Sequence, residues 1–173
     1  MEKSIRTDRL ALHVPGRDEL GFRRSLLSDP ATMAYNAPWF PPDGCLAFPE
    51  SEWDSFYGWW IGHEPDRFYA YLRRISDGAF VGEVDYRRAP GRGAWDMGIV
   101  VSAAYRGLGC GAEGLRLLLE RAFVTDGVAC LQNDFETTRA AACRIHKAAG
   151  FREVEVKDGI VHLELTREEY LAK

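Results

Sequence analysis

The segment YRGLGCGAEGL, residues 105–115, combines one arginine with four glycines and leads into the helical pattern RLLLERAF. Glycines let the backbone approach a ligand closely, and the first N–H groups of a helix have no partner within it. These donors, with the positive end of the helix dipole, form an anion site to which Arg106 can add a charge-assisted hydrogen bond. We therefore expect a phosphate group at this loop, the alternative being a glycine-rich turn that binds nothing.

Three of these glycines also fit the fingerprint of dinucleotide-binding proteins. Gly109, Gly111 and Gly114 spell G-x-G-x-x-G, and Asp134 follows after about twenty residues, as that fingerprint asks. However, the fingerprint places its first glycine against the end of a strand in alternating strands and helices. Here residues 102–108 intervene, and the preceding strands are predicted to be antiparallel. A dinucleotide-binding protein is therefore the disfavoured alternative.

The elements that must position this loop follow from the apolar periodicity. Strands are expected over 4–14, 67–75, 79–88, 94–101, 127–133, 151–157 and 160–165. Helices are expected over 17–29, 29–36, 51–62, 110–123 and 137–150. The order β-α-α-β-β-β-α-β-α-β-β predicts an α+β fold, with a mixed, mostly antiparallel sheet of about seven strands flanked by helices. Residues 1–173 are expected to form a single domain.

Composition excludes several classes of function. The net charge is −4 and no basic stripe occurs, so no nucleic-acid partner is expected. No apolar run approaches a membrane span, and residues 1–14 lack the apolar core of a signal peptide. Neither the four cysteines nor the four histidines show metal-ligand spacing. We expect a cytoplasmic protein with reduced thiols, without a metal ion or a membrane partner.

Three segments together resemble a known family. Residues 96–123, DMGIVVSAAYRGLGCGAEGLRLLLERAF, resemble the acetyl-CoA signature of the GNAT superfamily of N-acetyltransferases, in which an R/Q-x-x-G-x-G/A loop wraps the pyrophosphate of CoA. RIHKAAGFREV, residues 144–154, resembles the later Y-x-K-x-G-F segment, and RTDRLALHV is similar to the start of the branch that includes ribosomal-protein alanine acetyltransferases. The resemblance implies a GNAT-like fold in which an amine attacks the thioester of acetyl-CoA directly.

The resemblance also implies which residues bind the cosubstrate. The pyrophosphate would be held by Arg106 with the N–H groups of Gly107, Gly109, Cys110, Gly111 and Ala112. The pantetheine arm would pair with the backbone of Ile99, Val100 and Val101, and one of their N–H groups would act as the oxyanion hole. Arg139 stands where the family often has an asparagine that bonds the CoA arm.

Several residues are candidates for transferring protons during the reaction. His146 stands where the family often has a tyrosine acid for the departing thiolate, and imidazole can donate a proton near neutral pH. The alternative for His146 is a half-exposed helix residue without a catalytic role. Asp96 is a candidate general base or a sheet-surface carboxylate paired with an arginine. Glu83 and Asp85 share a strand face and are further candidates, and a chain of water molecules is another.

The acceptor is expected to be an amine, because aromatic and acidic residues gather in residues 35–69. Aromatic faces and carboxylates together suit a cation such as a polyamine, an aminoglycoside or a peptide N-terminus. Trp39 and Trp59 are the pocket candidates there, since Trp53, Phe56 and Trp60 form a core stripe. Asp134, with Glu136, is expected to open toward the cleft. A non-catalytic acyl-CoA-binding or regulatory module is the main alternative function, and this kind of sheet is compatible with an edge-strand homodimer.

Overall fold

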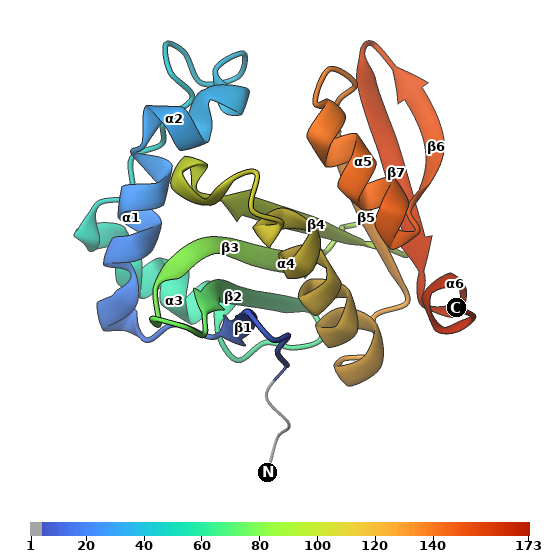
Figure 1. Cartoon of the computed structure of the whole chain (residues 1–173), viewed down its shortest axis with the longest axis horizontal. Helices are drawn as coiled ribbons and strands as arrows, with labels where there is room; N and C mark the ends of the chain where they lie inside the picture. Colours follow the sequence, from blue (N-terminus) through green and yellow to red (C-terminus); the bar gives the residue numbers. More distant parts are fainter. Residues whose placement is uncertain (1–4) are drawn as a thin grey trace.

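A seven-stranded sheet forms the centre of the computed structural model, which describes residues 5–173 (Figure 1). The strand order is β1-β2-β3-β4-β5-β7-β6, and every neighbouring pair is antiparallel except β4 and β5. The predicted mixed, mostly antiparallel sheet is therefore confirmed. The strands are β1 (Leu10–His13), β2 (Arg67–Arg74), β3 (Phe80–Arg88), β4 (Trp95–Val101), β5 (Cys130–Glu136), β6 (Arg152–Lys157) and β7 (Ile160–Thr166). Residues 1–4, where the predicted first strand and the N-terminal segment begin, lie outside the described part.

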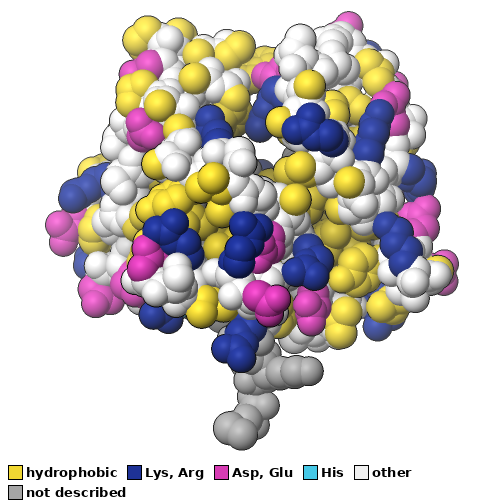
Figure 2. All heavy atoms as spheres, viewed as in Figure 1, with side chains coloured by type: hydrophobic (Ala, Val, Ile, Leu, Met, Phe, Trp, Pro, Cys, Tyr) yellow, Lys and Arg dark blue, Asp and Glu magenta, His cyan; other side chains and the backbone are white. Residues whose placement is uncertain are grey.

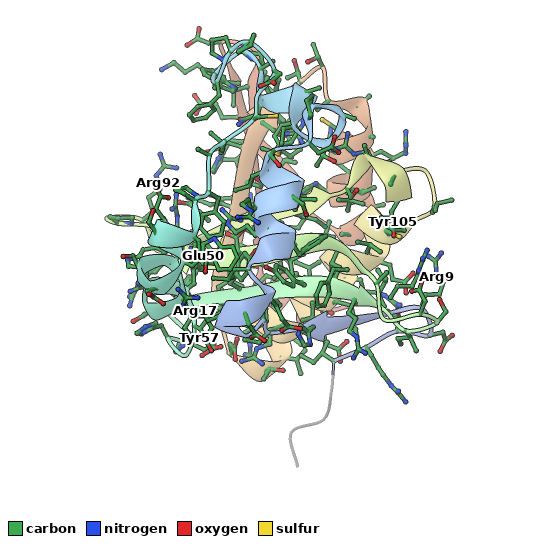
Figure 3. All side chains as sticks on the ribbon, turned by 90° about the vertical axis from the view of Figure 1, so that its left-hand side faces the viewer. Arg9, Arg17, Glu50, Tyr57, Arg92 and Tyr105 are labelled. Carbon is green, nitrogen blue, oxygen red and sulfur yellow. The ribbon has the colours of Figure 1, made fainter. Side chains whose placement is uncertain are left out.

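Helices cover both faces of the sheet. Helices α4 and α5 lie on one face, whereas α1 crosses the other face with α3 beside it (Figures 1 and 3). The helices are α1 (Gly21–Leu27), α2 (Pro30–Met33), α3 (Trp53–Trp60), α4 (Cys110–Leu119), α5 (Ala140–Ala149) and α6 (Arg167–Leu171). The helix α6 was not predicted; Thr166 caps it by accepting a hydrogen bond from the N–H of Glu169.

The main core lies between the sheet and α4, whose apolar face matches the helical period. Its predicted face is fully buried and comprises Leu115, Leu118 and Leu119, with Ala122 and Phe123 in the π-helical turn that follows. At roughly 25 cal/mol per Å² of buried apolar surface, such a face is the main force holding a helix on a sheet. The start of α4 is therefore fixed against the sheet.

The strands β4 and β5 separate soon after they meet. Their parallel pairing is confined to Trp95 with Leu131 and Asp96 with Gln132. Beyond these pairs, the sheet opens into two halves, one ending in β4 and the other formed by β5, β7 and β6 (Figure 1). The antiparallel β2-β3-β4 meander that precedes the glycine loop excludes the alternating fold of a dinucleotide-binding domain, so that alternative was wrong.

Within residues 5–173, no helix has the length and apolar character needed to cross a membrane.

Candidate active site

The glycine loop forms the N-terminus of α4 as predicted. Gly109 is the N-cap residue with φ +82°, and Gly107 has φ +74°, a region that favours glycine. The first intrahelical hydrogen bond runs from the N–H of Glu113 to the carbonyl of Gly109. The N–H groups of the residues between them, 110–112, are therefore free of helix partners and available to an anion.

The N-terminal segment holds the outer side of this loop. Arg9 donates from Nη1 to the carbonyl of Leu108 at 2.8 Å and forms an ion pair with Glu113 in the first turn of α4. The hydroxyl of Thr7 bonds to the same carboxylate. These contacts join the start of the chain to the loop and preorganise its backbone donors.

Arg106 has a different set of partners from the one expected. Its guanidinium donates to three backbone carbonyls, at 3.1 Å to Val101, 3.2 Å to Ala31 and 2.6 Å to Thr32. Three of its five N–H groups therefore tie α2 to the end of β4, while the residue still lines the cavity beside the loop. Its direct role toward a pyrophosphate remains a proposal, and its structural role is evident.

Only alternate residues of β4 direct their backbone groups into the gap between the two halves of the sheet. The N–H of Ser102 donates to Val81 at 2.9 Å, and the carbonyl of Val100 lies against Gly82, so both face β3. Because backbone groups alternate along a strand, Ile99 and Val101 face the gap instead. The carbonyl of Val101 accepts from Arg106, which leaves the N–H groups of Val101 and Ile99 and the carbonyl of Ile99 for a bound arm.

A cavity of about 770 Å³ occupies the gap between the sheet halves. The surface is hollowed between them, with basic side chains beside the hollow (Figure 2). The cavity extends from the start of α4 past the end of β4 to the start of α5, with Tyr35 at the far side of the sheet. Its lining includes all the expected cosubstrate residues except Cys110: Ile99, Val100, Val101, Arg106, Gly107, Gly109, Gly111, Ala112 and Arg139.

The sequence pattern that defines the acetyltransferase (GNAT) domain matches residues 9–152 of this chain. The chain belongs to the GNAT acetyltransferase family. It is therefore an acyltransferase, and its cosubstrate is acetyl-CoA. No curated protein sequence matches the chain.

Solved structures of GNAT proteins share the fold. A spermidine N-acetyltransferase from Vibrio cholerae, crystallised with CoA and spermine, is 16% identical with a TM-score of 0.77, over 95% of this chain and 99% of that one. A GNAT-family acetyltransferase from Bacillus anthracis is 16% identical with a TM-score of 0.74, over 96% and 99% of the two chains. FdhC, described as a nucleotide-linked sugar GNAT, is 12% identical with a TM-score of 0.74, over 99% and 94%.

In this GNAT domain His146 is buried, not half-exposed, and lines the cavity. Its Nδ1 lies 2.8 Å from the carbonyl of Ala142, which can only accept, so Nδ1 carries the proton. Its Nε2 lies 3.1 Å from the amide nitrogen of Asn133 and accepts from it. Burial between the rings of Phe135 and Phe151 lowers the pKa of His146. This arrangement favours a neutral ring joining α5 to β5 over an acid that donates to a thiolate.

Arg139 and Tyr35 lie at the side of the cavity opposite α4. The guanidinium of Arg139, at the N-cap of α5, is 4.3 Å from the ring centre of Tyr35 and 5.4 Å from that of Phe135. Burial raises the pKa of Tyr35, so its hydroxyl stays protonated at neutral pH. Sequence reasoning did not select Tyr35, Asn133 or Arg144, because each enters the cavity through tertiary packing.

Two of the predicted carboxylates, Glu83 on β3 and Asp96 on β4, have fixed partners and do not line the cavity. Glu83 is buried, forms an ion pair with Arg23 of α1 and accepts the hydroxyl of Tyr69. Asp96 accepts from Nε2 of Gln132 at 2.6 Å. Because both carboxylates are held by these partners, a role as the base remains a proposal that this geometry does not favour.

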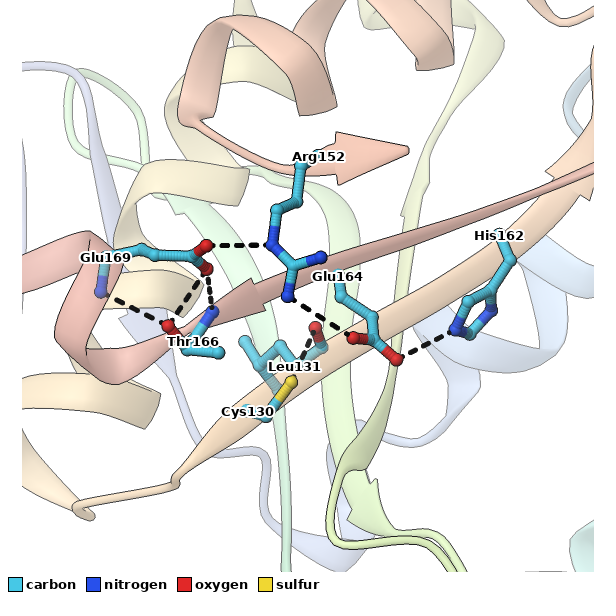
Figure 4. Close-up of polar contacts among 7 residues, drawn as sticks. All are labelled: Cys130, Leu131, Arg152, His162, Glu164, Thr166 and Glu169. Atoms are coloured by element: carbon cyan, nitrogen blue, oxygen red, sulfur yellow. Dashed lines mark hydrogen bonds and ion pairs between the residues drawn. The ribbon is translucent and has the colours of Figure 1, made fainter. Parts of the chain in front are cut away.

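Asp134 does line the cavity, and it pairs with a histidine. His162 on β7 lies between Asp134 and Glu164. From Glu164 the contacts continue through Arg152 to Glu169 and Thr166 (Figure 4). The pKa of His162 is raised by its hydrogen bonds to the two carboxylates, against the effect of burial.

The two tryptophan candidates lie outside the lining of this cavity. Trp39 is 61% exposed, and its Nε1–H donates to Glu136 at 2.8 Å, linking the segment after α2 to the end of β5. Trp59 stacks with Arg67, whose guanidinium carbon is 4.1 Å from the ring centre. It lines a separate cavity of about 550 Å³ between α1 and α3. Within residues 5–173, no three His, Cys, Asp or Glu side chains are grouped to hold a metal ion.

Proposed function

We propose that this enzyme transfers an acetyl group from acetyl-CoA to a primary amine that attacks the thioester directly. The observation that carries the proposal is the cavity between β4 and β5, whose two ends differ in charge. One end holds the free N–H groups of α4 with Arg106, and the other opens toward Asp134 and Tyr35, with Arg139 against the ring of Tyr35. The first end suits a pyrophosphate and the second an amine cation.

The backbone of β4 offers a hydrogen-bond donor for the oxygen of the thioester. An acyl transfer builds negative charge on the thioester oxygen, and a fixed N–H donor near it lowers the barrier. The N–H of Ile99 faces the gap and has no partner on β5, where pairing ends at Asp96. We propose that Ile99 and Val101 hold the pantetheine arm and that one of their N–H groups polarises the carbonyl.

The acceptor class that the site favours is a cationic amine. The Vibrio cholerae protein of similar fold is named for spermidine and was crystallised with spermine, which supports this choice. A peptide N-terminus, the acceptor implied by the resemblance of residues 6–14, is the other class to test. The four cysteines are free, which supports placing the reaction in the cytoplasm.

Calorimetric binding of acetyl-CoA, CoA and NAD to the purified protein tests the cosubstrate site. We expect acetyl-CoA and CoA to bind and NAD not to bind. The variant Gly109→Trp should abolish binding, because position 109 has φ +82° and a side chain there would displace Arg9, which holds the loop. Gly91→Trp is the matched control, since Gly91 has a similar φ of +71° in the β3–β4 turn. Loss of binding in both variants would point to general misfolding instead of a blocked site.

Release of CoA thiol with a panel of amines tests the transfer. The panel contains spermidine, an aminoglycoside and a short peptide with a free N-terminal alanine. Turnover with spermidine alone would support the polyamine class, and turnover with the peptide alone would support the N-terminal class. A protein that binds acetyl-CoA but turns over no amine would contradict the proposed function.

A further inference from the structure

Among the described residues, one carboxylate on the sheet face that carries Glu83 and Asp96 has no fixed partner. On β3 and β4, Glu83 is bound to Arg23 and Tyr69, and Asp96 is bound to Gln132. Asp85, between them on the same face, makes no hydrogen bond or ion pair within the described part of the chain. A half-buried carboxylate without a donor is costly, and the three N–H groups of an ammonium would satisfy it.

Asp85 is not itself a lining residue, but it lies directly behind Gly98, which forms part of the cavity wall. It is opposite Gly98 across the β3–β4 ladder, and a Cβ atom at position 98 would lie 2.5 Å from its Oδ2. Gly98 lines the cavity one residue before Ile99, whose N–H faces the thioester position proposed above. The absence of a side chain at 98 therefore lets the Asp85 carboxylate rest against the cavity wall.

We propose that Asp85 is the carboxylate that receives the acceptor ammonium and removes its proton, an inference that rests on the proposed acetyl transfer. The ammonium gives one proton to Asp85, and the freed lone pair forms the C–N bond to the thioester carbonyl carbon. The C–S bond breaks with its electron pair on sulfur. The nitrogen loses one more proton as the amide forms, the sulfur gains one to become the thiol, and Asp85 releases its own to water.

The charged groups around Asp85 suit a role as the general base. Burial, followed by the charge of Glu83, raises the pKa of Asp85 to about 7. Asp96 on β4 also raises the pKa of Asp85, whereas Arg23 on α1 and Arg87 on β3 lower it. Tyr69 on β2 is paired with Asp85 across the β2–β3 ladder. A base that titrates near the working pH combines a useful deprotonated fraction with proton affinity.

The test is steady-state thiol release from pH 5.5 to 9, with acetyl-CoA and spermidine, or another panel amine if the wild type prefers it. Asp85→Asn should lower kcat/KM by about 10²–10⁴-fold, a typical range for a general base. It should also remove the rise in kcat/KM near pH 7 that the wild type is expected to show. Acetyl-CoA affinity, measured by calorimetry, should stay within twofold of the wild type.

Three further variants make the result decisive. Gly98→Ala keeps the carboxylate but displaces it, and should lower kcat/KM at least tenfold. Asp77→Asn, in the exposed β2–β3 turn, is the control and should behave as wild type. If Asp85→Asn keeps kcat/KM within threefold, or if Asp96→Asn alone abolishes the pH-dependent rise, the role of Asp85 is overturned while the transferase stands. If the wild type binds acetyl-CoA but turns over no amine, the proposed function fails and this inference fails with it.

Discussion

The half-buried position of Asp85 predicts a pH-dependent stability that requires no substrate. Its folded-state pKa of about 7 lies above the value of 3.8 for the free side chain. The folded protein therefore holds this proton more tightly than the unfolded chain does. The contribution of Asp85 to stability is complete below pH 3.8 and is lost as the pH rises through 7.

The expected magnitude follows from the two pKa values. Integrating proton binding from pH 5 to pH 8.5 gives a loss of about 3 kcal/mol in the free energy of unfolding from this one group. Asp85→Asn does not titrate, so the wild type should lose about 3 kcal/mol more than the variant over that interval. In a thermal scan this corresponds to roughly 5–11 °C in Tm for a chain of this size.

Urea unfolding of both proteins at pH 5, 6, 7 and 8.5 measures the difference, with equal slopes in urea as the check that both unfold alike. Asp77→Asn is again the control. Its bidentate contact with Arg74 lowers the pKa of Asp77 to about 2, so it stays ionised across the interval and its loss adds only a constant offset. Parallel pH dependences for the wild type and Asp85→Asn would refute the reasoning, because they would show that the carboxylate titrates equally in both states.

Three other variants test the scaffold around the cavity. Arg106→Met removes the donors to the carbonyls of α2 and β4 and should lower Tm and raise the Kd for acetyl-CoA about tenfold in calorimetry; unchanged values in both would contradict the bridging role. His146→Leu leaves Asn133 without its acceptor and should cost about 1–3 kcal/mol in urea unfolding. Because burial lowers the pKa of His146, the wild type should lose stability as the pH falls below 6.5, and the variant should lack that loss. Glu113→Ala releases Arg9 and should raise the Kd for acetyl-CoA by about fivefold at most, an effect that high salt should reduce.

Much of the scaffold was predictable because its signals are local. The strands expected over 151–157 and 160–165 leave Asp158 and Gly159 between them, and both residues have positive φ, as a tight hairpin turn requires. The apolar face of α4 is buried as its period indicates, and Gly109 caps the helix in the left-handed conformation. In each case the determining residues are neighbours in the chain, so the pattern carries the information.

The hydrogen-bond and ion-pair partners of the polar side chains could not be predicted without the tertiary structure. Glu83 and Asp85 are two residues apart on one strand face and are chemically alike, yet only Glu83 has an arginine partner. That partner, Arg23, comes from a helix sixty residues earlier in the chain. His146 is likewise a neutral, buried ring because Asn133 and two phenylalanines pack against it.

The order of elements, the glycine-capped helix and the family could be inferred from the amino-acid sequence. The separation of β4 and β5, the β4 N–H groups that face the gap, and the carboxylate that has no partner within the described residues became evident only in the folded chain. The physical reason is that backbone conformation depends mainly on adjacent residues. The pairing and pKa of a buried polar group depend instead on which distant residues the fold brings within hydrogen-bond range.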